Sequence, residues 1–196
     1  MMSHDLNSYF FKIRGSILLL GTKDEFPEIR GIKLLTEEMI DLVQHSVALA
    51  DAGLVIDKKH KVNLGHLVRD VAVRHLPEGI ALVQGQLQSV MADEIKLIQI
   101  FQNLFDNAVE HGNPTTVEVQ RYDSKEGVRI VVINDGKPIR TDSRPKVFQR
   151  GFTTKDKRKG YGLSIVKKLV EAHGWQIKLA DTPETAFEIL IPNAAG

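Results

Sequence analysis

Apolar residues in the N-terminal quarter of the chain recur at alternating steps of four and three, the pattern of amphipathic helices. One stripe runs from Leu6 to Leu20 and another from Ile32 to Leu49, with a polar connector at residues 21–27. Two helices of this length cannot enclose a core alone, so we expect an antiparallel hairpin that pairs with a second copy into a dimeric four-helix bundle. The alternative is that both helices pack on the chain's own sheet.

The pattern changes after residues 51–60, where a glycine and a charged cluster interrupt the helical period. Beyond this boundary, apolar spacing and β-branched runs predict helices and strands in alternation. Helices are expected at residues 62–73, 93–111 and 164–173, an extended segment at 80–90, a hairpin at 116–121 and 128–133, and a final strand pair at 176–180 and 186–191. The fold class is therefore α+β, an α/β sandwich whose mixed sheet is covered by helices on one face. We place the helical hairpin at residues 1–56 and the second domain at residues 60–196.

Composition narrows the classes of function. The 196 residues include 26 Lys plus Arg against 25 Asp plus Glu, so no global field attracts nucleic acid or an anionic membrane. The absence of cysteine excludes disulfides, thiolate catalysis and cysteine-based zinc sites. Neither a membrane-spanning run nor a signal peptide is visible, so we expect a cytoplasmic protein with no membrane segment.

The most informative stretch is residues 102–111, which carries Asn103 and Asn107 one helical turn apart. At this spacing both amides project from one helix face. Amide oxygens are hard, neutral ligands suited to Mg²⁺, which usually keeps several waters and is shared with the phosphates of a substrate. Two glycine-containing turns follow, at residues 134–139 and 159–166. Together the three motifs indicate an ATP site.

The order of these motifs resembles the ATP-binding domain of bacterial sensor histidine kinases, within the wider GHKL family that includes DNA gyrase, Hsp90 and MutL. The resemblance covers most of residues 60–192. It implies that the first motif holds Mg²⁺, the second reads adenine and the third wraps the phosphates. It assigns ATP and Mg²⁺ as cofactors, with Asn107 and Asn103 as metal ligands. The residues that it places at the nucleotide are Asn103, Asn107, Asn134, Asp135, Gly136, Ile139, Phe148, Thr154, Lys155, Gly160, Tyr161, Gly162, Leu163 and Thr185.

Several positions depart from the family pattern. Asn134 stands where the adenine-reading aspartate is usual, with the carboxylate one residue later at Asp135, and Pro138 and Arg158 replace common glycines. Asn103 stands where ATP-hydrolysing relatives have a catalytic glutamate. Because an amide cannot act as a general base for water, transfer to another acceptor is favoured over hydrolysis.

A basic segment, residues 140–160, lies between the two glycine motifs and resembles the family's mobile lid over ATP. Residues 148–155 within it match the phenylalanine box of these kinases. Lysine and arginine side chains there are suited to neutralising phosphates, although charge runs also commonly just face water. The glycines at 160 and 162, ahead of a predicted helix, allow backbone N–H groups to approach the phosphates.

The N-terminal sequence resembles the phosphoacceptor motif of the same kinases. His4 lies off the apolar stripe, on the exposed side of the first predicted helix. By this resemblance His4 accepts the γ-phosphoryl group from Mg-ATP, Asp5 is its acid and base partner, and Ser8 occupies the position associated with dephosphorylation of the partner. The group then passes to an aspartate of a response regulator in two-component signal transduction.

Two other functions remain open from the sequence. One is a histidine phosphotransferase or scaffold with a degenerate ATP-binding domain, which the departures at Asn134 and Arg158 favour. The other is an anti-sigma-type serine kinase built on the same ATP domain, which the His-bearing hairpin disfavours because such kinases need no phosphoacceptor helix.

Overall fold

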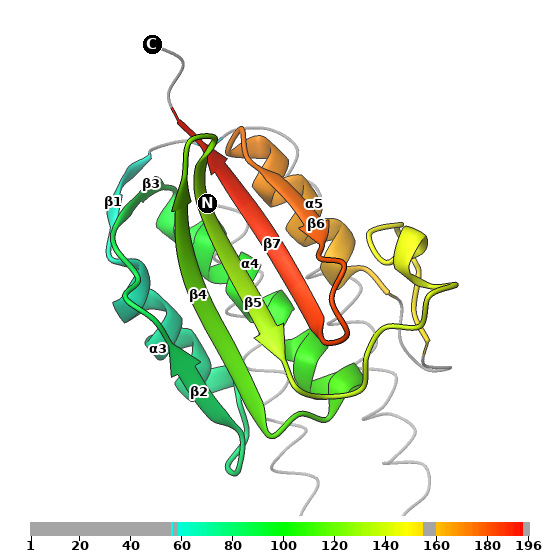
Figure 1. Ribbon diagram of the computed structural model, residues 1–196. Coiled ribbons are helices and arrows are strands. Elements are labelled where there is room, and N and C mark those ends of the chain that lie inside the picture. The colour runs from blue at the N-terminus through cyan, green and yellow to red at the C-terminus, as the bar shows by residue number, and fades with distance from the viewer. Residues whose placement is uncertain (1–55, 57–58, 155–159, 194–196) are drawn as a thin grey trace, which may run out of the picture. The chain divides into compact units, whose positions relative to one another are not determined.

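The computed structural model describes residue 56, residues 59–154 and residues 160–193 (Figure 1). The predicted N-terminal hairpin, with His4, Asp5 and Ser8, lies outside the described residues, as do Lys155 and Arg158. All described elements belong to the second of two units into which the chain divides, residues 52–196.

A five-stranded sheet forms the frame of this unit, with strand order β2-β4-β5-β7-β6. The strands are β2 (Ala81–Gln84), β4 (Thr116–Ser124), β5 (Gly127–Asn134), β6 (Gln176–Leu179) and β7 (Thr185–Pro192). β2 pairs in parallel with β4, and the other pairs are antiparallel, so the sheet is mixed. The register places Asn134, the last residue of β5, opposite Val117 on one side and Thr185 on the other.

Three helices cover one face of the sheet: α3 (Leu64–His75), α4 (Glu94–Asn107) and α5 (Gly162–Ala172) (Figure 1). Phe101 and Phe105 of α4 are buried, with ring centroids 6.0 Å apart. Ile130 and Val132 of β5 are also buried, whereas Val131 between them is partly exposed, as period-two alternation in a half-buried strand requires. The arrangement confirms the predicted α+β fold with helices on one face.

The start of the domain differs from the prediction. Val62, expected in a helix, belongs to β1 (His60–Val62), which pairs antiparallel with β3 (Val90–Ala92) in a separate two-stranded sheet. α3 begins later because the Asn63 side chain accepts a hydrogen bond of 3.0 Å from the His66 N–H and so caps the helix. The predicted extended segment at 80–90 is likewise divided between β2 and the start of β3.

α4 also ends earlier than predicted. After Asn107 the chain continues as a wider π-helical turn, η1 (Ala108–Gly112), and Asn113 then adopts a left-handed conformation with φ of 50°. Single π-helical turns of this kind are frequent at functional sites. The turn brings Gly112 beneath the end of β5, which matters for the site.

His173 connects the end of α5 to the start of α4. Its ring is buried, Nδ1–H donates to the Leu169 carbonyl at 2.7 Å, and Nε2 accepts from the Asp93 N–H at 3.2 Å. Burial lowers the pKa of His173 below its ordinary value, chiefly by penalising the charged imidazolium. The ring also packs against Trp175, with centroids 4.5 Å apart, and Trp175 is buried in the core.

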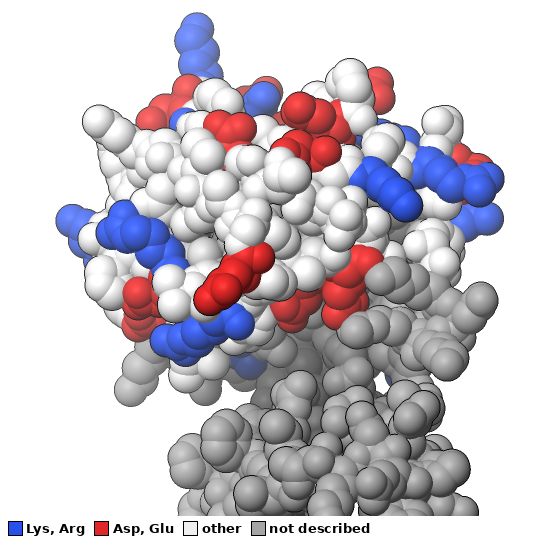
Figure 2. Space-filling model, turned by 90° about the horizontal axis from the view of Figure 1, so that it is seen from below, with Lys and Arg blue, Asp and Glu red and all other residues white. Residues whose placement is uncertain are grey.

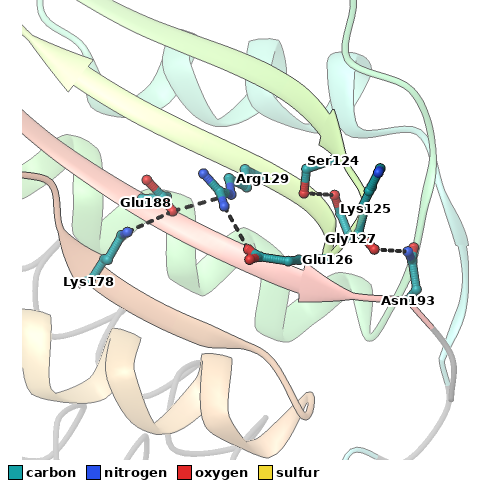
Figure 3. A network of polar contacts seen from close by, with 8 residues as sticks. All are labelled: Ser124, Lys125, Glu126, Gly127, Arg129, Lys178, Glu188 and Asn193. Carbon is teal, nitrogen blue, oxygen red and sulfur yellow. Dashed lines mark hydrogen bonds and ion pairs between the residues drawn. The ribbon is translucent and has the colours of Figure 1, made fainter.

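The other face of the sheet carries a polar network. Glu188 of β7 lies 3.2 Å from the Lys178 ammonium and 3.7 Å from Nε of Arg129, whose Nη2 donates to Glu126 at 2.7 Å (Figure 3). The hydrogen bond to Glu126, together with the negative charge of Glu188, raises the pKa of Arg129 above its ordinary value. In the space-filling view charges of both signs are interspersed (Figure 2), in agreement with a net charge near zero. In the described part of the chain, no helix is long and apolar enough to cross a membrane.

Candidate nucleotide site

Asn103 joins the first predicted motif to the third. Its Nδ2 donates to the Gln99 carbonyl at 2.8 Å, one turn earlier in α4, and this bond fixes which atom of the amide is the oxygen. The oxygen lies beside the first residue of α5: a Cβ added at Gly162 would be 3.0 Å from Asn103 Oδ1. Glycine at 162 therefore leaves the space in front of the amide oxygen open.

Asn107 ends α4 on the same face as Asn103 and is half-buried. Two neutral amide oxygens suit Mg²⁺ that is completed by waters and substrate phosphates. Among the described residues, no cluster of three or more His, Asp or Glu side chains offers a cage for a metal by itself. The donor set thus fits a magnesium ion that arrives with its nucleotide.

Gly112 and Gly136 join the first motif to the second through a direct backbone contact. A Cβ at Gly136 would lie 2.5 Å from the Gly112 carbonyl carbon and 2.8 Å from its Cα, so only glycine fits. The Lys137 N–H donates to the Gly112 carbonyl at 2.8 Å and holds the contact together. The π-helical turn after Asn107 is therefore locked against the turn that follows β5.

Asn134 is buried at the end of β5, with 4% of its surface exposed. Its Oδ1 accepts from the Gly136 N–H at 3.2 Å, and its Nδ2 donates to the Thr185 carbonyl at 3.4 Å. Thr185 is also buried and its hydroxyl lies 3.5 Å from the Lys137 carbonyl. The two predicted residues from β5 and β7 thus meet at one end of the sheet.

Asp135 points the other way, because successive residues at a strand end face opposite sides. Its carboxylate accepts from the Thr115 N–H at 2.8 Å, the Thr115 hydroxyl at 2.5 Å and the Thr116 N–H at 2.9 Å. These bonds, led by that from the Thr115 hydroxyl, lower the pKa of Asp135. The Asp135 carboxylate thus holds the start of β4. Ile139, further along the same turn, is half-buried.

The first part of the basic segment is packed onto the domain. After the short helix η2 (Arg144–Lys146), Val147 is buried and Phe148 meets Phe187 of β7 edge-on, with centroids 6.0 Å apart. Arg144 donates to the Ala180 carbonyl in the loop between β6 and β7. These anchors place Phe148 beside the strand that carries Thr185.

The second part of the basic segment leads back to α5, and a backbone hydrogen bond joins its two ends. The Gly151 N–H donates to the Gly160 carbonyl at 3.1 Å, and Gly160 has φ of +60°, where a Cβ would also strike the Phe152 carbonyl. Tyr161 lies beneath the Arg150 guanidinium, 5.6 Å from the ring centroid. Gly162 and Leu163 then form the first turn of α5.

His111 and Thr154 form a contact that the sequence did not predict. His111 Nδ1 lies 3.1 Å from Thr154 Oγ1, so the π-helical turn touches the basic segment. The motif analysis also missed that Gly112 and Thr115 shape the site through Gly136 and Asp135. A signal existed in the sequence Gly112-Asn113 directly after the asparagine helix, since both residue types favour unusual backbone conformations.

Comparison with known proteins agrees with this geometry. Residues 92–195 match the family model of histidine kinase-, DNA gyrase B- and HSP90-like ATPases. The sensor protein KdpD of Clostridium acetobutylicum is 30% identical over 205 aligned positions, which cover 90% of this chain but 22% of that protein. The chain therefore spans about a fifth of that curated relative.

Solved structures give the same result. The catalytic domain of histidine kinase ThkA superposes with a TM-score of 0.60 at 29% identity, covering 69% of this chain and 96% of that domain. A structure of ThkA with the response regulator protein TrrA has a TM-score of 0.68, covers 97% of this chain and 59% of the ThkA chain, and at 23% identity shows the shared fold. The chain belongs to the histidine kinase-, DNA gyrase B- and HSP90-like ATPase family, among the two-component sensor histidine kinases.

Proposed function

We propose that this chain is the catalytic core of a sensor histidine kinase, which transfers the γ-phosphoryl group of Mg-ATP to His4. The observation that carries the proposal is the meeting of three separate motifs at one end of the domain. Asn103 lies against Gly162, and Gly112 lies against Gly136, at positions where any side chain would fill the space. Such backbone cradles are typical of sites that admit phosphates.

Each motif has a proposed role at the nucleotide. Asn107 and Asn103 hold Mg²⁺, which when bound neutralises phosphate charge. Gly160, Tyr161, Gly162 and Leu163 bring backbone N–H groups and the positive end of α5, a helix of 11 residues, to the phosphates. Asn134 and Thr185 face the base from the sheet, with Ile139 and Phe148 beside them.

The polar groups of the site favour transfer over hydrolysis. Asn103 presents an amide where a carboxylate would be needed to take a proton from water, and its Nδ2 is already bound to the Gln99 carbonyl. The domain therefore supplies position and charge neutralisation, and the acceptor comes from another part of the protein.

His4 is the proposed acceptor. A histidine of ordinary pKa is substantially neutral near pH 7, and its unprotonated nitrogen attacks the γ-phosphorus as the bond to ADP breaks. Asp5 accepts the N–H of the other ring nitrogen, and Ser8, four residues after His4 in the sequence, positions water for dephosphorylation of the partner regulator. We further propose that residues 1–56 form the dimeric bundle that presents His4.

The phosphoryl group then passes to an aspartate of a response regulator. The support is the relationship to two-component kinases, one of which, ThkA, is known in a complex with such a regulator. Because transfer ends on a soluble receiver domain, we also propose a cytoplasmic location.

Incubation with Mg-ATP labelled in the γ-phosphate tests the kinase. The wild type is expected to take up label that is lost in acid and stable in alkali, as a phosphohistidine is. His4→Gln and Asn107→Ala should both abolish it, the first without loss of nucleotide binding. Matched controls are His66→Gln, on the exposed side of α3, and Asn193→Ala, at the far end of the sheet; both should label normally.

The same assay separates the alternatives. A wild type that binds no nucleotide, yet accepts phosphate onto His4 from a phosphorylated receiver domain, would be a phosphotransferase with a degenerate ATP domain. Acid-stable label on a partner protein would instead indicate a serine kinase. Either result would overturn the proposed function.

A further inference from the structure

Lys59 ties the start of the domain to the end of α5. Its ammonium donates a hydrogen bond of 2.7 Å to the carbonyl of His173, the residue that caps the C-terminus of α5. Carbonyls at a helix C-terminus have no partner within the helix and carry the negative end of its dipole, so they favour a cation. The two residues are 114 positions apart, so this contact belongs to the tertiary fold and not to a local turn.

The same junction is also joined to the start of α4. The buried His173 ring accepts from the N–H of Asp93, whose own side chain caps α4. The residue after Lys59 adds a second tie, because Nε2 of His60 lies 3.2 Å from the carboxylate of Glu94, the first residue of α4. Lys59 and His60 thus contact the end of the domain at which α4 begins and α5 finishes.

The strand that follows Lys59 is too short to fix the path of the chain by itself. β1 has three residues, which pair with β3 in a two-stranded sheet separate from the main sheet. Isolated pairs of strands are only marginally stable. Val62, at the end of β1, is buried, whereas Lys59 and His60 are exposed, so the path of these two residues depends on their side-chain ties.

The junction is remote from the candidate nucleotide site. α4 and α5 lie side by side (Figure 1), and Asn107 ends α4 where Gly162 begins α5, so the two helices run in opposite directions between the junction and the site. The 14 residues of α4, at about 1.5 Å each, place Asp93 about 20 Å from Asn107. An effect of Lys59 on phosphoryl transfer therefore cannot come from contact with the nucleotide.

We propose that Lys59 is a positioning residue for phosphoryl transfer, because its tie to the α4–α5 junction fixes the direction in which the chain enters the nucleotide domain. The proposal rests on the proposed function, since it concerns delivery of the same phosphoryl group to His4. The covalent link between residues 1–56 and this domain passes through Lys59, whether transfer occurs within one chain or across a dimer. Transfer requires reacting atoms about 3–3.5 Å apart, so a loosened link lowers the fraction of time in which they meet.

Two measurements on the full chain test this role: the rate of His4 labelling at saturating Mg-ATP, and the dissociation constant of ATP. Lys59→Met keeps an unbranched side chain of similar length and removes the ammonium. We expect a labelling rate about three- to tenfold lower, the change that one exposed hydrogen bond supplies, with the ATP dissociation constant within about twofold of the wild type. Lys59→Arg keeps a donor and should recover most of the rate.

Lys61→Met is the matched control. Lys61 is exposed two residues further along, in β1, where it pairs with Met91 of β3. The control makes the same chemical change and should label at the wild-type rate. Hydrogen exchange of the β1 amides adds a readout that is independent of catalysis, and it should be faster in Lys59→Met than in Lys61→Met.

The results separate this inference from the proposed function. If Lys59→Met labels as fast as the wild type, or faster, the positioning role is overturned and the kinase stands. A parallel loss of labelling rate and ATP affinity would also overturn it, because Lys59 would then act through the fold of the nucleotide site. A wild type that takes up no label would overturn the proposed function and this inference with it.

Discussion

The Gly112–Gly136 contact makes a strong prediction for Gly136→Ala. The new Cβ would lie 2.5 Å from the Gly112 carbonyl carbon, whereas non-bonded carbons rest about 3.5–4.0 Å apart. The backbones must therefore separate by about 1 Å, which would also stretch the 2.8 Å hydrogen bond from the Lys137 N–H. Overpacking costs about 1–3 kcal/mol and the lost hydrogen bond about 1, so we expect a destabilisation of about 2–4 kcal/mol.

Urea unfolding followed by tryptophan fluorescence measures this cost. Trp175 is the single tryptophan of the chain and is buried in this domain, so its emission reports the domain's unfolding. The midpoint should fall while the slope with denaturant stays constant. Nucleotide affinity should fall as well, because the same contact aligns the end of α4 with the turn that follows Asn134 of β5.

Gly65→Ala is the matched control, since it makes the same chemical change where there is room. Its Cβ would lie 3.4 Å from the Leu87 carbonyl oxygen, an ordinary contact, in the first turn of α3. Alanine there should be neutral or stabilise by up to about 1 kcal/mol. If Gly136→Ala unfolds within about 0.5 kcal/mol of the wild type, or if both variants lose equal stability, the steric argument is refuted.

Three further predictions concern stability. The free energy of unfolding should fall as pH drops below 6.5, because the folded state depresses the pKa of His173 and the unfolded chain takes up the proton first. Urea midpoints at pH 7.5 and 5.5 measure this fall. An equal fall in His173→Gln would contradict the assignment to His173. Asn63→Ala should cost about 1 kcal/mol by removing the cap of α3, seen as a lower thermal midpoint; no change would show that another group satisfies the His66 N–H. Glu188→Gln should cost about 0.5–1 kcal/mol at low salt and less at 1 M salt, whereas a salt-independent loss would mean that packing matters more than charge.

The long, periodic elements of the ATP-binding domain could be predicted from sequence, and the short ones could not. α4, α5 and the β4–β5 hairpin carry clear apolar patterns over many residues. β1 has three residues and pairs with β3 about thirty positions later, so neither strand shows a period of its own. The apolar pattern therefore predicts Val62 in the helix, whereas in the structure Asn63 caps that helix and Val62 lies in β1.

Motif order predicts which residues belong to the candidate site, but it does not predict their contacts. Asn103 and Gly162 were placed in separate motifs, and only the packing of α4 against α5 brings the amide oxygen to the glycine. The π-helical turn after Asn107 ends at Gly112, in a tertiary contact with Gly136 that no local pattern encodes. The roles of His4, Asp5 and Ser8 stay predictions.

The β4–β5 hairpin also bears on how the domain reaches this fold. Its strands pair in register from Val117 with Asn134 to Ser124 with Gly127, and the Ser124 hydroxyl donates to the Gly127 carbonyl at 2.9 Å (Figure 3). β2 and β7 join its two sides from distant parts of the chain, so their pairing must wait for costly loop closure. We therefore expect the hairpin to form early in folding: substitutions in its turn should slow refolding, whereas those at the β2–β4 contact should mainly accelerate unfolding.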